Sequence, residues 1–548
     1  MGYVLQFFAA FLTLALGEIA WMGGARFLPA LPLLFLWPHL SSLAARRAFA
    51  RRKLRLGAAF ERGVVAAPVA IQAIAVLFGW LGALRNRLGV AVPVDGWPGI
   101  GLLAGLAPFL LAECIAIDAR ARLFGSERAP VLAARIFQLR LLASTFAPFL
   151  IYLAAASLVG LRESWRVRVE EISLLSALFS LALVASFVLL LPQLLRLTWD
   201  TAPLAPGPER KVLEDMARRA RFRCRDLLLW RTGNQVANAA IVGLLPRNRL
   251  VLFSDALLAE LEPRELAGVF AHEIGHARRR HVLLFGCHIL GFVLGAEALL
   301  GSFEQPSFEV EFAVLGACLF FWFLSFGWLS RRVELEADLE SLELLGESGP
   351  LVRALVGVSG AHAHRRSSWR YFSTAQRVRF LLQAEANPSV GRKLRRKLRL
   401  FGVASALLFT GVAGYELRGL FESFDEERVV VDLRLGRYDE ARAGFERARS
   451  DDTDLAALVG VASTLRPDAR SPEDLEAAAL LAAARGDFAR AGRLIELALL
   501  RGRSELEPVR EFLERAARGQ ALPGDDILLE TWRRQMRSAR ESPKEGST

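Results

Sequence analysis

The chain has 548 residues, of which 53% are hydrophobic and 23% are charged, and its mean hydropathy is +0.31. The apolar residues form long runs with clusters of charge between them, which is typical of a polytopic membrane protein with soluble portions and excludes an ordinary soluble globular chain. A formal net charge of +12 does not indicate nucleic-acid binding, because no nucleic-acid fold motif accompanies it and arginine-rich loops beside membrane spans explain it.

Nine apolar runs have about 20 residues each, the length that a helix needs to cross roughly 30 Å of hydrocarbon. Six of them form an expected N-terminal transmembrane region, 1–200, and the next two predict a transmembrane hairpin, 282–329. A last transmembrane helix is expected at 399–417. The nine runs are 4–22, 25–42, 63–84, 98–118, 141–161, 172–195, 282–300, 310–329 and 399–417.

Clusters of arginine and lysine orient this map of spans. They occur at 46–53, 120–140 and 392–397. All three fall on the same side of an alternating nine-span map, and the positive-inside rule makes that side the cytoplasm. The segments 196–281 and 330–398 are then cytoplasmic and the chain beyond 418 is outside, although an error of one span would reverse that last statement.

The stretch 204–281 is soluble in character. An amphipathic helix is expected from Pro208 to about Arg221, followed by short apolar runs between turns, which predict a small β-sheet. Pro263 stands at a favoured first-turn position of the next helix. This part of the chain is therefore expected to be α+β.

That next helix carries His272-Glu273-Ile274-Gly275-His276, an HExxH motif. Residues four apart share one helix face, so both imidazoles can reach a single metal ion. Two histidines and one carboxylate are a typical ligand set for zinc, with the fourth position left for water. Glu273 can act as the general base on that water.

A third metal ligand is expected from the segment Ser330–Asp338, on a helix that continues from the eighth span. Glu334 can ligate zinc, and Asp338, four residues later on the same face, can accept the second ring N–H of a zinc-bound histidine. The 334 − 276 = 58 intervening positions are filled by the hairpin, which would return the chain beside the HExxH helix.

The paired motifs resemble those of the integral-membrane zinc metallopeptidases of the HtpX and CaaX-prenyl endopeptidase type. The resemblance covers roughly 205–385 and implies a zinc metallopeptidase domain at 204–385, interrupted by the hairpin, that binds one Zn²⁺ per chain. It implies His272, His276 and Glu334 as metal ligands, Glu273 as the base and Asp338 as the partner of a ligand.

Two further features of this family can be placed on the chain. Asn238 matches a substrate-binding asparagine on a sheet edge, and Arg377 matches a downstream arginine that we also assign to substrate binding. Six residues before Arg377, where the family has a histidine, this chain has Tyr371. Tyr371 can donate to an oxyanion, or it can be a packing aromatic, and the sequence does not decide between the two.

The segment 424–538 is expected to be a soluble helical domain. Gly436–Ala441 and Gly486–Ala491 share a small–aromatic–small pattern that resembles the second helix of tetratricopeptide repeats. The separation, 486 − 436 = 50, exceeds one such repeat, so a generic domain of helical hairpins is an equal alternative. Helical repeats usually bind proteins, and a protein partner is expected here.

The predicted fold is thus mainly α: a polytopic transmembrane protein with a cytoplasmic α+β metallopeptidase domain and a C-terminal helical domain. The expected function is hydrolysis of peptide bonds in membrane-associated or misfolded proteins. The expected location is a bacterial inner membrane, with the zinc site on the cytoplasmic side. The alternative is a membrane receptor or sensor whose peptidase domain relays a signal or recruits clients through the C-terminal domain.

Overall fold

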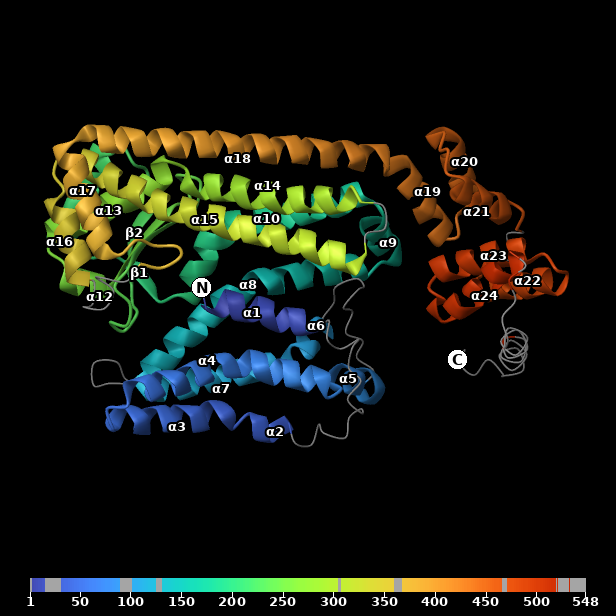
Figure 1. Cartoon of the computed structure of the whole chain (residues 1–548), viewed down its shortest axis with the longest axis horizontal. Coiled ribbons are helices and arrows are strands. Elements are labelled where there is room, and N and C mark those ends of the chain that lie inside the picture. Colours follow the sequence, from blue (N-terminus) through green and yellow to red (C-terminus); the bar gives the residue numbers. More distant parts are fainter. Residues whose placement is uncertain are drawn as a thin grey trace. The chain divides into compact units, whose positions relative to one another are not determined.

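The computed structural model describes residues 2–14, 31–88, 101–124, 131–303, 307–358, 367–465, 471–518, 520 and 532 (Figure 1). The chain forms two compact units. The first comprises Met1–Ser157 and Leu183–Glu416, and the second comprises Leu158–Ala182 and Leu417–Thr548. Each unit has hydrophobic clusters of its own.

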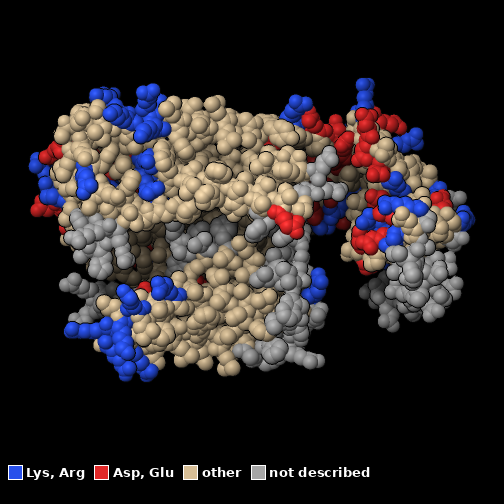
Figure 2. Space-filling model, in the orientation of Figure 1, with Lys and Arg blue, Asp and Glu red and all other residues tan. Residues whose placement is uncertain are grey.

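The protein is a mainly helical, polytopic membrane protein. Among the described residues, six helices are long and apolar enough to cross a membrane, and each overlaps one of the nine apolar runs. They are α4 (Leu54–Leu77), α8 (Val131–Gly160), α10 (Ser173–Thr198), α14 (His281–Gly301), α15 (Phe308–Leu345) and α18 (Pro388–Glu422). In the first unit, Figure 2 shows an almost charge-free band along these helices on the visible face, with Lys and Arg gathered toward the end that holds the sheet.

The other three apolar runs do not coincide with helices of spanning length in the described part of the chain. The runs 4–22, 25–42 and 98–118 extend in part outside the described residues. Their described parts form α1 (Gly2–Leu12), α2 (Leu31–Leu34), α3 (Trp37–Ala50), α6 (Gly101–Gly105) and α7 (Ala107–Phe124).

Helix α7 shows why an apolar run need not correspond to a membrane-spanning helix. It contains Glu113, Asp118 and Arg120, and the carboxylate of Glu113 is fully buried against the guanidinium of Arg120. The helix packs inside the N-terminal bundle against α3 and α4, where the Ser42 hydroxyl donates to the carbonyl of Ala119 at 2.9 Å. These charges are satisfied by neighbouring helices, so the segment does not need to be uniformly apolar. Helix α5 (Trp80–Leu88) follows α4 in this bundle.

A four-stranded sheet follows the third spanning helix, α10, in the first unit. Its strand order is β1-β2-β4-β3, with β2 parallel to β4 and with β1 and β3 antiparallel to their neighbours. Because β2 and β4 are parallel, the chain between them must cross over, and β3, which lies in this connection, forms the edge of the sheet beyond β4. The strands are β1 (Thr201–Pro203), β2 (Asp226–Trp230), β3 (Ala239–Val242) and β4 (Leu250–Ser254).

Helices cover this sheet and enclose its core. Phe270 is fully buried and meets the ring of Phe253 edge-on at 5.7 Å, so the helix of the HExxH motif is packed directly on the central strand β4. The helices are α11 (Pro208–Arg219), α12 (Asp255–Glu260), α13 (Pro263–Arg278), α16 (Gly349–Val358) and α17 (Thr374–Ala386). Helix α15 is continuous over 38 residues, so its first part belongs to the spanning segment and its later part packs against α13.

The second unit consists of paired helices. Gly436 and Gly486 adopt left-handed conformations in the turns that connect α19 to α20 and α22 to α23. The two small–aromatic–small segments therefore open the second helix of two hairpins, with α21 between them. The helices are α9 (Glu163–Glu171), α19 (Phe424–Arg434), α20 (Tyr438–Ala448), α21 (Thr453–Ser463), α22 (Pro472–Ala484), α23 (Phe488–Leu500) and α24 (Glu507–Ala517), with a 3₁₀ turn at Ser504–Leu506. Whether these hairpins are tetratricopeptide repeats stays a prediction, and the predicted end of the domain at 538 lies outside the described residues.

Candidate metal centre

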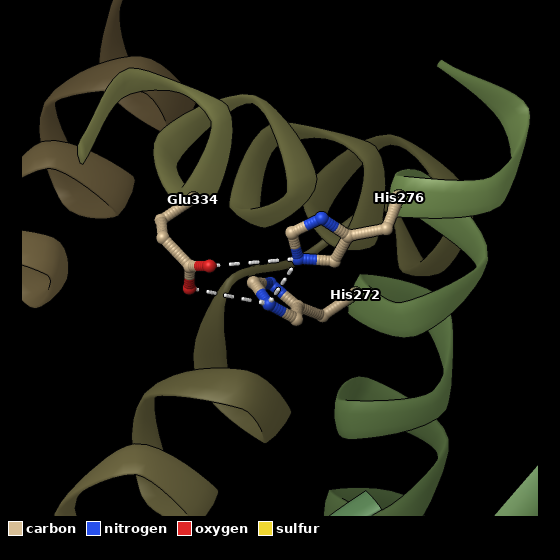
Figure 3. Close-up of side chains that lie close together, drawn as sticks. All are labelled: His272, His276 and Glu334. Atoms are coloured by element: carbon tan, nitrogen blue, oxygen red, sulfur yellow. Dashed lines mark hydrogen bonds and ion pairs between the residues drawn. The ribbon is translucent and has the colours of Figure 1, made fainter. Parts of the chain in front are cut away.

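Two histidines of α13 and one glutamate of α15 converge on a common point (Figure 3). The Nε2 atoms of His272 and His276 lie 3.2 Å apart, and each lies 3.8 Å from an oxygen of Glu334. One ligand atom from each residue falls within 4.8 Å of the others. The sequence prediction that a hairpin brings Glu334 beside the HExxH helix corresponds to this geometry.

Helix α13 is well defined at its start. Pro263 occupies the first turn, and Glu262 and Glu265 form a capping box in which each side chain binds the other's backbone N–H. This arrangement satisfies donors that would otherwise lack partners at a helix start. The register of His272 and His276 on the helix is therefore set by local chemistry as well as by packing.

Small residues allow α13 and α15 to approach closely. A Cβ on Gly275 would lie 2.9 Å from the Cβ of Glu340 and 3.0 Å from the Cα of Ala337. Ala337 is itself fully buried at this contact. Because no larger side chain fits between the helices, Glu334 can reach the histidines without distortion of either backbone.

Asp338 orients His272. Its carboxylate is fully buried and lies 2.9 Å from the Nδ1 of His272, so the Nε2 of that ring faces Glu334. Arg377 of α17 donates to both oxygens of Asp338, at 2.9 Å and 2.5 Å, and lies 3.7 Å from an oxygen of Glu334. The predicted substrate-binding arginine is thus at the site, with its guanidinium engaged by these two carboxylates.

His281 orients the second ligand, and the sequence analysis did not assign it this role. Its Nδ1 lies 2.9 Å from the Nδ1 of His276, and its Nε2 lies 3.0 Å from an oxygen of Glu336. His281 is 1% exposed, so this chain of contacts is shielded from solvent. Burial and the neighbouring His272 hold the pKa of His276 well below its ordinary value, which keeps this imidazole neutral and able to ligate.

The cluster opens into a cavity of about 430 Å³. Its lining includes the polar residues Asn238, Glu273 and Tyr371 as well as apolar residues of α12, α13 and α16. The lining residues are Ala237, Asn238, Ala239, Leu257, Val269, His272, Glu273, His276, Glu334, Leu351, Ala354, Leu355, Val358, Tyr371, Thr374 and Arg377. Seven of the eight residues predicted for the site line this cavity, and the eighth, Asp338, lies next to His272 outside the lining.

Three of these residues have distinct surroundings. Burial raises the pKa of Glu273 to about 7, a value suited to a group that takes up and releases a proton near neutral pH. Tyr371 is 47% exposed, so it is not a core packing residue. Asn238 directly precedes the edge strand β3, and its backbone N–H donates to the Ser254 hydroxyl at 2.9 Å.

The donor set fits zinc. Ligand atoms about 2.1 Å from a tetrahedral ion lie roughly 3.4 Å from one another, and the three separations here are 3.2, 3.8 and 3.8 Å. The Nδ1 atoms of both histidines are occupied by Asp338 and His281, which leaves both Nε2 atoms directed at the same point. These are the residues that could hold the ion.

Comparisons with known proteins find similarity over the part of the chain that contains this site. Residues 209–424 match the model of peptidase family M48. Protease HtpX homolog 1 of Streptomyces coelicolor is 33% identical over 138 residues, which cover 23% of this chain and 45% of that protein. Protease HtpX homolog of Moorella thermoacetica is 30% identical over 139 residues, covering 23% and 46%. The chain thus spans about half the length of the curated relatives it matches.

A solved structure is also similar. The crystal structure of S. mikatae Ste24p matches with 15% sequence identity and a TM-score of 0.43, over 70% of this chain and 99% of that one.

Proposed function

We propose that this integral membrane protein, whose residues 209–424 match the model of peptidase family M48, is a zinc-dependent endopeptidase. His272, His276 and Glu334 would hold one zinc ion, and Glu273 would act as the general base. The observation that supports this proposal best is the convergence of the three ligands beside Glu273 in one cavity.

Each residue of the site would have a separate role in hydrolysis. Zinc, when bound, would supply Lewis acidity toward the scissile carbonyl and the attacking water. Glu273 takes the proton from that water and passes it to the leaving amine. Asp338 and His281 hold the rings of the two ligands, and Tyr371 donates to the oxyanion that develops on the carbonyl oxygen.

The cavity also suggests how a substrate is held. The edge strand β3 can pair with an extended peptide, and Asn238 lies at the end of that edge beside the metal ligands. The apolar residues of the lining, among them Leu257 and Leu351, would receive a hydrophobic side chain. Binding would therefore favour unfolded polypeptide over folded protein.

We propose membrane-associated or misfolded proteins as the substrate class. Helix α14 begins at His281, five residues after the ligand His276, so the site directly adjoins a membrane-spanning helix. Substrates would be cleaved at the membrane surface, on the cytoplasmic side according to the distribution of basic residues. Prenylated CaaX proteins are less favoured, since that activity belongs to only one branch of the family.

The test is to purify the full chain and the Glu273→Gln variant in detergent and to measure zinc content and cleavage of an unfolded membrane protein. We expect one zinc per chain in both proteins, and cleavage by the wild type only. Glu260→Gln on the exposed end of α12 is the matched control and should remain active. Cleavage that persists in Glu273→Gln would refute the mechanism, and a protein without zinc or cleavage would favour the receptor alternative.

A further inference from the structure

The second unit contains a cavity of about 400 Å³ whose lining shares no residue with the metal centre. It lies where α9, the first turn of α10, α19 and α20 meet. Its lining residues are Arg168, Ile172, Leu175, Phe424, Arg428, Val431, Asp432, Arg437, Glu440 and Arg447. Four arginines and two acids give the lining a formal charge of 4 − 2 = +2.

The four arginines are available to a ligand. In the part of the chain that the structure describes, no carboxylate forms an ion pair with Arg168, Arg428, Arg437 or Arg447. The guanidinium of Arg428 lies over the ring of Phe424, 5.8 Å from its centre.

Three glutamates outside the lining are engaged where α9 and the start of α10 meet α19. Arg434 lies 3.2 Å from an oxygen of Glu170 and also pairs with Glu171. Glu427 accepts from both the backbone N–H and the hydroxyl of Ser173, at 2.9 Å and 2.6 Å. These bonds hold the walls of the cavity together. Asp432, which lines the cavity, interacts electrostatically with Arg168, Arg428 and Arg437, so the lining keeps a formal charge of +2.

The lining also contains apolar residues, which lie near the ends of two candidate membrane spans. Ile172, Leu175, Phe424 and Val431 belong to one hydrophobic cluster. Leu175 lies in the first turn of α10, which has the highest mean hydropathy of the candidate spans, 2.6, and Phe424 follows the end of span α18 by two residues. The cavity therefore has a cationic part and an apolar part at the level where two spans end.

We propose that this cavity binds an anionic phospholipid. Its phosphate would be bound by Arg168, Arg428, Arg437 and Arg447, because guanidinium groups match phosphate oxygens in charge and geometry. An acyl chain would continue along Ile172 and Leu175 into the bilayer beside α10. A free phosphate would satisfy the arginines but not the apolar wall, and an acidic peptide would not continue into the membrane.

The experiment uses the purified full chain in a non-ionic detergent, freed of lipid. Its melting temperature is followed while short-chain phosphatidylglycerol, short-chain phosphatidylcholine, inorganic phosphate or poly-glutamate is added. We expect saturable stabilisation by phosphatidylglycerol and none by the other three at equal concentration. The double variant Arg168→Gln/Arg428→Gln should raise the apparent Kd for phosphatidylglycerol about tenfold or more.

Two further variants control this result. Arg418→Gln/Arg442→Gln removes the same charge from exposed arginines of α18 and α20 that pair with Glu422 and Glu446, and its Kd should match the wild type. Arg437→Gln/Arg447→Gln, on the other wall, should weaken binding as the first variant does and covers the case in which the first does not fold. Equal Kd values in all proteins, or equal stabilisation by phosphatidylcholine, phosphate or poly-glutamate, would overturn the proposal.

Discussion

Gly275 is the position where α13 touches α15, and one added methyl group there should loosen the metal site. The new Cβ would lie 2.9 Å from the Cβ of Glu340 and 3.0 Å from the Cα of Ala337, whereas non-bonded carbons rest at about 3.5–4.0 Å. The helices would have to separate by about 3.5 − 2.9 = 0.6 Å. Neither neighbour can yield, because Ala337 contributes backbone and Glu340 is held by Arg278 at 2.7 Å and Arg279 at 2.9 Å.

The cost of this separation can be estimated for stability and for zinc binding. Overpacking destabilises the fold by about 1–3 kcal/mol, and the higher helix propensity of alanine stabilises it by about 1 kcal/mol. The free energy of unfolding should therefore fall by about 0–2 kcal/mol. Metal sites tolerate only about 0.2 Å of ligand displacement. We therefore expect Gly275→Ala to weaken zinc binding about 10–100-fold, which is about 1.4–2.8 kcal/mol.

The assay is competition for zinc with a chromophoric chelator, on wild type and variant in the same detergent. Gly286→Ala on α14 is the matched control, because a Cβ there meets nothing within 4 Å. Helical circular dichroism should be unchanged in both variants. If Gly275→Ala bound zinc as tightly as Gly286→Ala, the contact between the two helices would not set the position of the ligands.

Three other predictions follow from the partners of the site. Asp338→Asn removes the charged acceptor 2.9 Å from His272, so zinc affinity should fall about 10–100-fold. The free energy of unfolding, measured in denaturant, should fall by about 3–5 kcal/mol. Unchanged values of both would exclude an orienting role for Asp338. His281→Ala removes the partner of His276 and should weaken zinc binding about tenfold in the same competition assay, and equal affinity would show that His276 is held without it. Burial raises the pKa of Glu273 to about 7, and a raised pKa in the folded state contributes stability that is lost as the pH rises through it. The zinc-free protein should therefore lose stability in denaturant melts between about pH 4.5 and 7, and Glu273→Gln should reduce this slope; parallel curves would contradict it.

The sequence allowed much of the fold to be predicted because a bilayer imposes a length on every span. The runs at 282–300 and 310–329 coincide with α14 and the first part of α15 for this reason. The length and apolar composition of the run at 98–118, by contrast, did not predict its structure correctly. There the described part of the run forms α6 and α7, and the buried carboxylate of Glu113 on α7 is satisfied by its neighbours in a way that composition does not show.

The metal ligands could be predicted because residues four apart on a helix share one face, and both motifs have that spacing. His281 and Glu336 could not, because their role depends on the turn between α13 and α14. Arg280 adopts a left-handed conformation, with φ of 54°, and this turns the start of α14 so that His281 faces back toward His276. Arginine gives no sequence signal for that conformation, which is usually a property of glycine or asparagine.

The membrane hairpin also explains why Glu334 reaches the site across so many residues. Helix α14 has 21 residues and rises about 31 Å, and the part of α15 from Phe308 to Glu334 has 27 residues and rises about 40 Å. Contacts between the two helices fix their levels, since Phe285 packs against Phe326 with ring centres 5.3 Å apart. From there α15 runs eight residues to Glu334 and α14 only four back to His281, so Glu334 lies about 6 Å past the start of α14. That is the level at which α13 holds its histidines, since His281 opens α14 and His276 precedes it by five residues. The contact between the two helices, more than the number of residues between the motifs, thus determines where the third ligand lies.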